Sequence, residues 1–358
     1  MTADFISYKK ACQIFDSNLD KSKLLELEAS GATAPLKKFK SGALFKKGWE
    51  MKDLPSIGRE FGFLPSFESP MSIAVFTTKG GVLKTTLTYN VARMAALHGL
   101  RTVVVGLDMQ GDVTNTLGHE DHEGDGSELT EELMRKINET QGLYDVFMGN
   151  ALVEETLYST ELPNLFYIPE TPELASLAES IGQINRREYW LTEKIINPLK
   201  EKFDLVIMDC SPNWNKLTTN ALVACDTLLS PLECKINNFR NVKVFKHFLG
   251  EFLDDMRLDF KTIFIPTKFS NQKKLSKEIA QWYLENVPGC TTGGIRESVV
   301  SEEAQAMRLS LIEHAPKSNA AIEMRSLLME VFSQFEPKKS RVTPRMDMNK
   351  STEFPKFN

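Results

Sequence analysis

A short segment rich in glycine, lysine and threonine, TTKGGVLKTT at residues 77–86, has the residue types of a phosphate-binding loop. It directly follows an apolar β-branched run and directly precedes a helical pattern. Gly80 and Gly81 let the backbone curl so that successive N–H groups and a helix N-terminus point at one anionic centre. Lys84 can then neutralise terminal phosphates, and Thr85 can offer its hydroxyl to Mg²⁺.

The loop departs from the general P-loop pattern, which has glycine where this chain has Thr78 and Leu83. An additional lysine, Lys79, stands directly before the paired glycines, and the segment resembles the deviant Walker A motif KGGxxK[ST] of the ParA/MinD family of P-loop ATPases. The resemblance implies ATP or ADP and Mg²⁺ as ligands. It also implies that Lys79 reaches across a dimer interface to the partner subunit's nucleotide, as an arginine finger does, which contributes roughly 10³ to 10⁵ in rate. The loop residues that it assigns to the nucleotide are Lys79, Gly80, Gly81, Val82, Leu83, Lys84, Thr85 and Thr86, with Lys79 and Lys84 also serving catalysis.

Two carboxylates follow in the order that this fold requires. RTVVVGLDMQGD resembles the family's DxDxQGN switch segment, with Gly106 in place of the first aspartate and Asp112 in place of the asparagine. By resemblance, Asp108 positions or polarises the attacking water. FDLVIMD ends an apolar run on Asp209, as a Walker B strand does, and this carboxylate would hold Mg²⁺ through a water beside Thr85. A single aspartate at a strand end can equally be a helix cap, so the order of the three pieces carries the assignment.

The elements that must position these residues alternate between two patterns along the chain. Strand-like runs lie at residues 72–78, 101–108, 165–169, 203–209, 227–233 and 261–268, and helical stretches of a dozen or more residues separate most of them. Continuous apolar strands separated by helices predict a doubly wound, mostly parallel α/β sheet covered on both faces, here of the P-loop NTPase type. The resemblance covers about residues 71–335, and it would bring Pro266 and Thr267 to the adenine edge.

The first 70 residues form a different unit, whose end is marked by Pro65 and Pro70. Two short helical patterns, a basic stretch and the segment GWEMKDLPSIGREFGFL resemble a MerR-like winged helix-turn-helix. We therefore predict a small N-terminal, helical, winged-HTH-like DNA-binding module at residues 1–70. The alternative is a small helical dimerisation cap with an exposed lysine face. In either case phosphate attraction is independent of DNA sequence, and the lysines assigned to it are Lys37, Lys38, Lys40, Lys46 and Lys47.

A second basic set lies within the predicted ATPase domain and could bind nucleoid DNA without sequence preference. Its assigned members are Lys243, Lys246, Lys273 and Lys274. A solvated helix face is the alternative interpretation of such a run. Residues 336–358 hold three prolines and little apolar content, which predicts a basic flexible tail.

Composition limits the remaining possibilities. The chain has 358 residues, 43 basic against 48 acidic side chains and a net charge of −5, which excludes a wholly basic coat and leaves only local patches for nucleic acid. Its five cysteines show no CxxC pairing, so we expect reduced thiols and a cytoplasmic protein. There is no apolar signal core, no window long enough to cross a bilayer and no amphipathic C-terminal stripe, so we expect no membrane attachment.

These observations favour the DNA-segregation branch of the family. The resemblance implies a plasmid or prophage partition ATPase whose ATP-bound homodimer binds nucleoid DNA, and whose hydrolysis a ParB-like centromere-binding partner stimulates. An operator is a further expected DNA target. Two alternatives stay open: a transcriptional repressor that uses the nucleotide only as a switch, and a ParA-like ATPase that positions a protein cargo.

Overall fold

The computed structural model describes residues 5–41, 44–118, 139–235, 238–269 and 273–335, and the predicted tail at 336–358 lies outside them. Its centre is an eight-stranded sheet of order β11-β10-β9-β4-β8-β5-β7-β6. The strands are β4 Met71–Val75, β5 Thr102–Leu107, β6 Tyr158–Ser159, β7 Leu165–Ile168, β8 Leu205–Cys210, β9 Thr227–Glu233, β10 Lys261–Phe269 and β11 Ile295–Arg296. All neighbouring strands pair in parallel except β6 and β7. The predicted doubly wound, mostly parallel sheet is confirmed.

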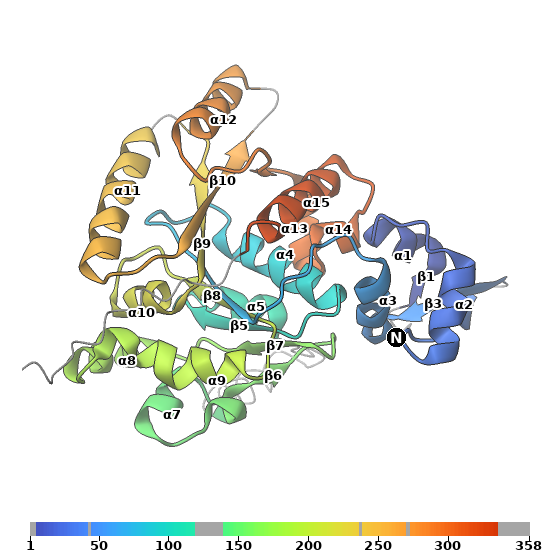
Figure 1. Ribbon diagram of the computed structural model, residues 1–358, viewed down its shortest axis with the longest axis horizontal. Helices are drawn as coiled ribbons and strands as arrows, with labels where there is room; N and C mark the ends of the chain where they lie inside the picture. The colour runs from blue at the N-terminus through green and yellow to red at the C-terminus, as the bar shows by residue number, and fades with distance from the viewer. Residues whose placement is uncertain (1–4, 42–43, 119–138, 236–237, 270–272, 336–358) are drawn as a thin grey trace, which may run out of the picture.

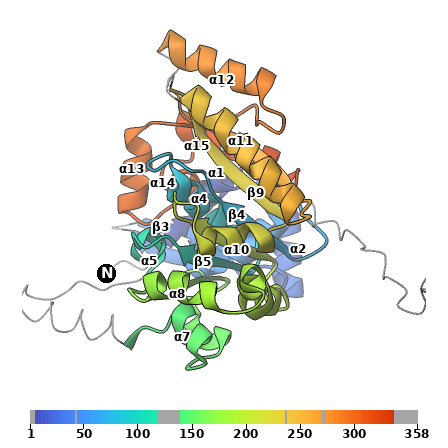
Figure 2. The ribbon, with the colours of Figure 1, turned by 90° about the vertical axis from the view of Figure 1, so that its left-hand side faces the viewer.

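Helices cover both faces of this sheet (Figure 1). They are α4 Lys84–Leu97, α5 Asp112–Leu117, α7 Leu143–Met148, α8 Leu174–Ser180, α9 Asn197–Lys200, α10 Lys216–Ala224, α11 Asn238–Asp255, α12 Lys274–Asn286, α13 Val299–Ala306, α14 Leu311–His314 and α15 Asn319–Phe332. Short 3-10 or π segments occur at Val153–Thr156, Ile181–Gln183, Arg187–Tyr189 and Thr192–Ile196. Helix α11 runs beside β9 in the view turned by 90° (Figure 2).

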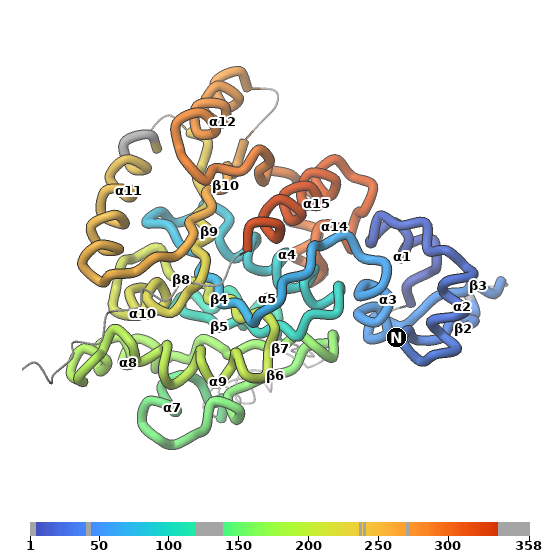
Figure 3. The backbone as a smooth tube through the Cα atoms, viewed as in Figure 1, coloured from blue at the N-terminus to red at the C-terminus, as the bar shows by residue number. Residues whose placement is uncertain are grey.

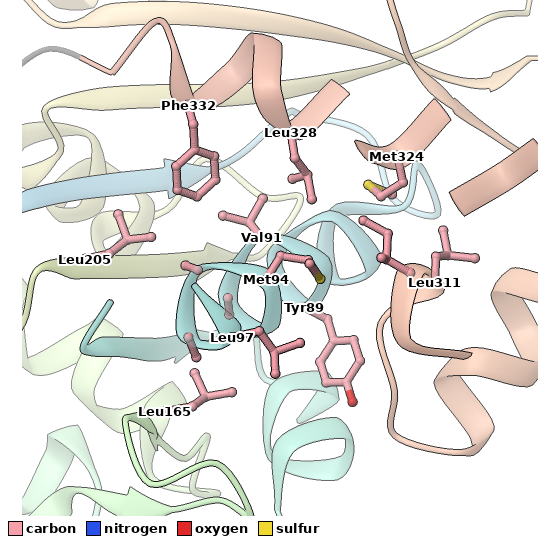
Figure 4. Packing of buried hydrophobic residues seen from close by; sticks show 14 of the residues in the cluster. Tyr89, Val91, Met94, Leu97, Leu165, Leu205, Leu311, Met324, Leu328 and Phe332 are labelled. Carbon is pink, nitrogen blue, oxygen red and sulfur yellow. The ribbon is translucent and has the colours of Figure 1, made fainter. Parts of the chain in front are cut away.

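Alternation along the strands explains why there are two covering layers. Ile73 and Val75 of β4 belong to one buried cluster with α4, α14 and α15, whereas Ala74 belongs to the cluster under α8 to α12. Figure 4 shows the first cluster, where Val91 and Met94 of α4 pack beneath α15. Because successive strand residues point to opposite faces, an all-apolar strand requires cover on both sides.

The N-terminal segment forms a small mixed unit beside α4 and α14 (Figures 1 and 3). Its elements are β1 Phe5–Ser7, α1 Tyr8–Ile14, α2 Lys21–Ser30, β2 Lys37–Ser41, β3 Leu44–Glu50, the 3-10 turn Met51–Asp53 and α3 Leu54–Phe61. Ser7 caps α1, and Asp20 caps α2 by accepting the backbone N–H of Ser22 at 2.7 Å. The basic stretch is an antiparallel hairpin of β2 and β3, and β1 pairs with β3 on its other side. Two helices followed by a hairpin are compatible with the predicted winged module, and its reading of DNA stays a prediction.

The N-terminal unit and the sheet share one hydrophobic core. The buried residues Trp49 and Leu54 belong to the same cluster as Leu97 of α4 and Leu328 of α15. Arg325 of α15 also donates a hydrogen bond to the Gln13 carbonyl at 2.9 Å. Because this apolar surface is shared, the two parts of the chain differ in fold on either side of residue 70 but pack continuously against each other. That residue 70 is a domain boundary stays a prediction.

His98 is buried where the N-terminal unit meets the end of α4. Its Nδ1–H donates to the Met94 carbonyl at 2.7 Å, and its Nε2 accepts the backbone N–H of Phe63 at 3.0 Å. The ring lies edge-on to Phe15 and Phe63. Burial lowers the pKa of His98 to about 4, since a charged imidazole would lose hydration and the bond from Phe63.

We expect His98 to make the protein acid-sensitive. A folded-state pKa below the unfolded value near 6.5 gives stability that is fully present above pH ~6.5 and is lost as the pH falls toward 4. The shift corresponds to roughly 2–4 kcal/mol. We therefore expect the free energy of unfolding, measured with urea, to fall less between pH 7 and pH 4.5 in His98→Gln than in wild type. The exposed His247→Gln is the matched control, and equal pH slopes in all three proteins would contradict the prediction.

Candidate nucleotide-binding site

The predicted site residues meet at one edge of the sheet. The loop after β4 leads into α4, Asp108 follows β5, and Asp209 is the second-last residue of β8. Strands β4, β8 and β5 are neighbours in the sheet, and their parallel pairing puts their carboxyl ends together. Ligands of open α/β sheets bind at this edge.

The loop between β4 and α4 has the curled backbone that phosphate binding needs. Gly81 has φ +67°, and Leu83, the N-cap residue of α4, has φ +69°. Leu83 thus adopts the left-handed conformation at the position where the general P-loop pattern has glycine, at a cost of about 1–2 kcal/mol. The free N–H groups of the first turn of α4 point out of the helix start and favour an anion there.

Lys84, Thr85 and Asp209 form the floor of the site, where Lys84 and Asp209 are buried and Thr85 is half-buried. Thr85 Oγ1 donates to Asp209 Oδ2 at 2.7 Å, and Thr88 Oγ1 donates to Asp209 Oδ1 at 2.7 Å. The pKa of Asp209 is raised to about 7, chiefly by burial and also by the charge of Glu170, while the two threonine hydroxyls and Lys84 oppose the rise. Thr88, one helical turn beyond Thr85, was not predicted.

This donor set fits Mg²⁺. A hydroxyl and a carboxylate, both hard oxygen donors, lie within hydrogen-bond distance of one another at the start of a phosphate-binding helix. Thr85 and Asp209 would hold the ion, directly or through water. A bound dication would also favour the ionised form of Asp209, which burial alone disfavours.

Lys79 is held by its own chain. Its Nζ lies 2.5 Å from Glu233 Oε2 and 2.8 Å from Asn238 Oδ1. Lys235 Nζ lies 2.6 Å from Glu233 Oε1. Burial alone would raise the pKa of Glu233, but its hydrogen bonds to these partners hold that pKa at about 2. Reaching a partner subunit's nucleotide therefore requires Lys79 to leave Glu233, so the role in trans stays a prediction. Glu233 and Asn238 were not predicted; the one signal was the place of Glu233 at the end of a strand on this edge.

Asp108 lies at the start of a short loop that connects β5 to α5. Its Oδ1 accepts the backbone N–H of Gln110 at 3.3 Å, and its carbonyl accepts that of Gly111 at 3.1 Å. Gly111 has φ +72° and is the N-cap residue of α5. Asp108 thus lies at the carboxyl end of β5, next to the strand that carries Asp209, and its action on water stays a prediction.

The predicted adenine contacts lie further along the sheet. Pro266 and Thr267 are buried in β10, between β9 and β11. Pro266 lines a cavity of about 390 Å³ whose other walls come from α12, the turn at residues 291–294 and the start of α15. The Thr267 hydroxyl is buried without a hydrogen-bond partner in the described part of the chain. Their contact with adenine stays a prediction.

The basic residues divide into paired and exposed ones. Lys37 binds Glu50 and Asp53, each at 3.1 Å, so this lysine is tied to the base of the hairpin and does not present a free charge. The exposed lysines of the hairpin are Lys38, Lys40, Lys46 and Lys47. Those of the second set lie on α11, at Lys243 and the half-buried Lys246, and at the start of α12, at Lys273 and Lys274. DNA contact by either set stays a prediction.

A curled loop after the first strand of a parallel sheet, a buried lysine and a Thr–Asp pair define a P-loop NTPase. The family model of an AAA domain, AAA_31, matches residues 71–262. The chain belongs to this family and is a ParA/MinD-family P-loop ATPase.

Two curated relatives share the ATPase part. Chromosome partitioning protein ParA of Myxococcus xanthus is 28% identical over 210 residues, which are 58% of this chain and 69% of that protein. Sporulation initiation inhibitor protein Soj of Bacillus subtilis is 32% identical over 163 residues, 46% of this chain and 58% of that protein.

Solved structures share the fold. A cobyrinic acid a,c-diamide synthase from Mycobacterium smegmatis with ADP and magnesium has a TM-score of 0.57 and 24% identity, covering 72% of this chain and 92% of that one. A Borrelia burgdorferi plasmid partition protein bound to AMPPNP has a TM-score of 0.59 and 19% identity, covering 75% and 100%. The ATP complex of a single-residue variant of Cyanothece McdA has a TM-score of 0.62 and 18% identity, covering 75% and 99%.

None of the helices in the described parts of the chain is both long and apolar enough to span a bilayer. The five cysteines of the chain all lie within those parts and are free thiols.

Proposed function

We propose that this protein is a DNA-segregation ATPase of the plasmid or prophage partition type. ATP and Mg²⁺ bind at the loop of residues 77–86, the ATP-bound protein forms a homodimer that binds DNA, and a ParB-like centromere-binding partner stimulates hydrolysis. It acts in the cytoplasm, on the nucleoid. The observation that carries the proposal is that one loop supplies two lysines: Lys84 lies buried at the helix start, and Lys79 lies against Glu233.

Lys79 supports the dimer part of the proposal. Its side chain keeps more than a third of its surface exposed, at 38%, while Glu233 is almost fully buried. The ammonium can therefore exchange a carboxylate of its own chain for a phosphate of another chain without a rearrangement of the sheet. Triphosphate would compete better than diphosphate for a cation held this way, because it carries more charge.

The charge distribution supports the DNA part. In the hairpin, Lys38 pairs in register with Lys47, and Phe39 pairs with Lys46, so the exposed lysines cluster on one short β-ribbon. Its tip carries two exposed apolar side chains, Leu44 and Phe45, each 71% exposed. Such a ribbon has the charge for phosphate contacts and the size for a groove.

The test is ATP turnover measured alone, with DNA and with the product of a neighbouring centromere-binding gene. We expect slow basal hydrolysis that DNA and the partner together raise at least tenfold. Absence of turnover with ATP-dependent DNA binding intact would favour the repressor alternative. Stimulation by a protein cargo without DNA would favour the cargo-positioning alternative. The Lys84→Ala variant serves as the zero-turnover control.

A further inference from the structure

Glu170 carries a carboxylate that reaches across a neighbouring strand. It lies two residues beyond the end of β7, and β7 pairs with β5. A Cβ built on Gly106 of β5 would lie 2.3 Å from Glu170 Cδ and 2.5 Å from Oε1. The carboxylate therefore occupies the space that a side chain at position 106 would take. Gly106 pairs in register with Asp209 on the other side, so Glu170 extends toward the metal-site carboxylate over a strand position without a side chain.

The partners of Glu170 belong to the start of α5. Its Oε1 accepts the backbone N–H of Val113 at 3.2 Å. Its Oε2 accepts the backbone N–H of Thr114 at 2.9 Å and the Thr114 hydroxyl at 2.5 Å. Backbone N–H groups in a first helical turn have no partner within the helix, and a carboxylate there also complements the helix dipole. Gly111, the N-cap residue, provides no side-chain cap, so Glu170 caps α5 from another strand.

This cap lies next to a short loop that has little freedom of its own. Only residues 108–111 separate the end of β5 from α5, and Asp108 accepts backbone N–H groups of Gln110 and Gly111 within it. One end of the loop is fixed by the sheet. The other end is fixed by α5, whose first turn Glu170 holds by hydrogen bonds to Val113 and Thr114. Asp108 is therefore only five residues from Val113, the first residue that Glu170 holds.

The electrostatics agree with this geometry. Burial raises the pKa of Glu170, while its bonds from Thr114 and Val113 lower it. The negative charge of Glu170 also contributes to the raised pKa of Asp209. Glu170 is thus linked to α5 by hydrogen bonds and to Asp209 by charge.

We propose that Glu170 is the positioning residue of the switch segment: from the end of β7 it reaches over Gly106, holds the start of α5 and thereby sets Asp108 for hydrolysis. This inference rests on the proposed ATPase function. Gly106 is part of the same device, because a side chain at that position would displace the carboxylate. Since the displaced group is the flexible end of a glutamate, Gly106→Ala moves Glu170 and leaves the strands in place.

The first test measures steady-state ATP hydrolysis in Glu170→Ala, the near-isosteric Glu170→Gln and Gly106→Ala. We expect kcat to fall about 10- to 100-fold in each variant, since a misplaced catalytic group costs on that order, while KM for ATP stays within about threefold. The double variant Gly106→Ala/Glu170→Ala should be no slower than either single variant. Glu173→Ala removes an exposed carboxylate from the same connection and is the matched control. A cap that served only stability would leave kcat unchanged, and kcat within twofold of wild type in Glu170→Gln and Gly106→Ala would overturn the proposal.

The second test does not depend on turnover. Amide hydrogen exchange at Val113 and Thr114 should be at least tenfold faster in Glu170→Ala and Gly106→Ala than in wild type and Glu173→Ala. Unchanged exchange would overturn the proposal. Faster exchange in a protein whose wild type hydrolyses no ATP would instead support the holding of α5 by Glu170 and refute the proposed ATPase function.

Discussion

Lys84→Ala loses nucleotide binding: we expect the affinity for ATP measured by calorimetry to fall at least 100-fold. Lys84 is the cation at the start of α4, where the curled loop directs phosphates, and its side chain is buried beside the Thr85–Asp209 pair. A charge-assisted hydrogen bond to phosphate contributes about 1.5–3 kcal/mol, and each 1.4 kcal/mol is a factor of ten. Loss of one such bond and of the opposing charge near Asp209 accounts for the expected effect.

Lys79→Ala is the matched control for Lys84→Ala. It removes the same charge from the same loop, but from a side chain that lies against Glu233 and Asn238. We expect it to retain ADP binding and to lose ATP-dependent dimerisation measured by light scattering. Thermal unfolding of both variants should stay cooperative. An affinity of Lys84→Ala for ATP within twofold of wild type would refute the assignment of the phosphate-binding lysine.

Asp108→Ala separates binding from hydrolysis. We expect ATP affinity within about threefold of wild type and a turnover rate at least 100-fold lower, because a positioned general base contributes about 10² to 10⁴ in rate. Asp108 lies after β5, whereas the loop and α4 that receive the phosphates follow β4. The ATP-bound, DNA-bound form should accumulate, which a nucleotide-dependent DNA-binding assay would detect.

The control for Asp108→Ala is Asp112→Ala. Asp112 is exposed, is the first residue of α5, and belongs to the same segment. Its loss removes one acidic group from a helix start, which costs about 0.3–1 kcal/mol of helix stability, and leaves the bonds of Glu170 to Val113 and Thr114 in place. If Asp108→Ala hydrolysed ATP at the wild-type rate, another residue would have to position the attacking water.

Much of the fold was predictable because it depends on local patterns. Continuous apolar runs at residues 72–78 and 203–209 predicted buried strands, and β4 and β8 lie there. Gly80 and Gly81 before Lys84 predicted a curled loop, and Gly81 and Leu83 both have positive φ angles there. Hydrophobic burial and backbone conformational preference act over a few residues, so their signals are visible in the sequence.

Pairing between distant residues was not predictable from those patterns. In the sequence, the five lysines of the basic stretch look equivalent. In the structure, Lys37 forms ion pairs with Glu50 and Asp53, because the base of the β2–β3 hairpin brings these residues together. Only the folded register distinguishes this lysine from its exposed neighbours. The predicted DNA-binding set thus includes one lysine that is already paired within its own chain, and its contact with DNA stays a prediction.

The sequence by itself determined the class of this protein: the loop of residues 77–86, Asp108 and Asp209 stand in one order on predicted strand ends. Only the tertiary structure decided how these groups are held. The contact of Lys79 with Glu233 joins residues 154 positions apart, and that of Glu170 with Thr114 joins residues 56 positions apart. The physical reason is the strand order, β9-β4-β8-β5-β7, which differs from the order along the chain. This strand order brings side chains that are distant in the sequence together at one sheet edge, and local sequence patterns do not predict such contacts.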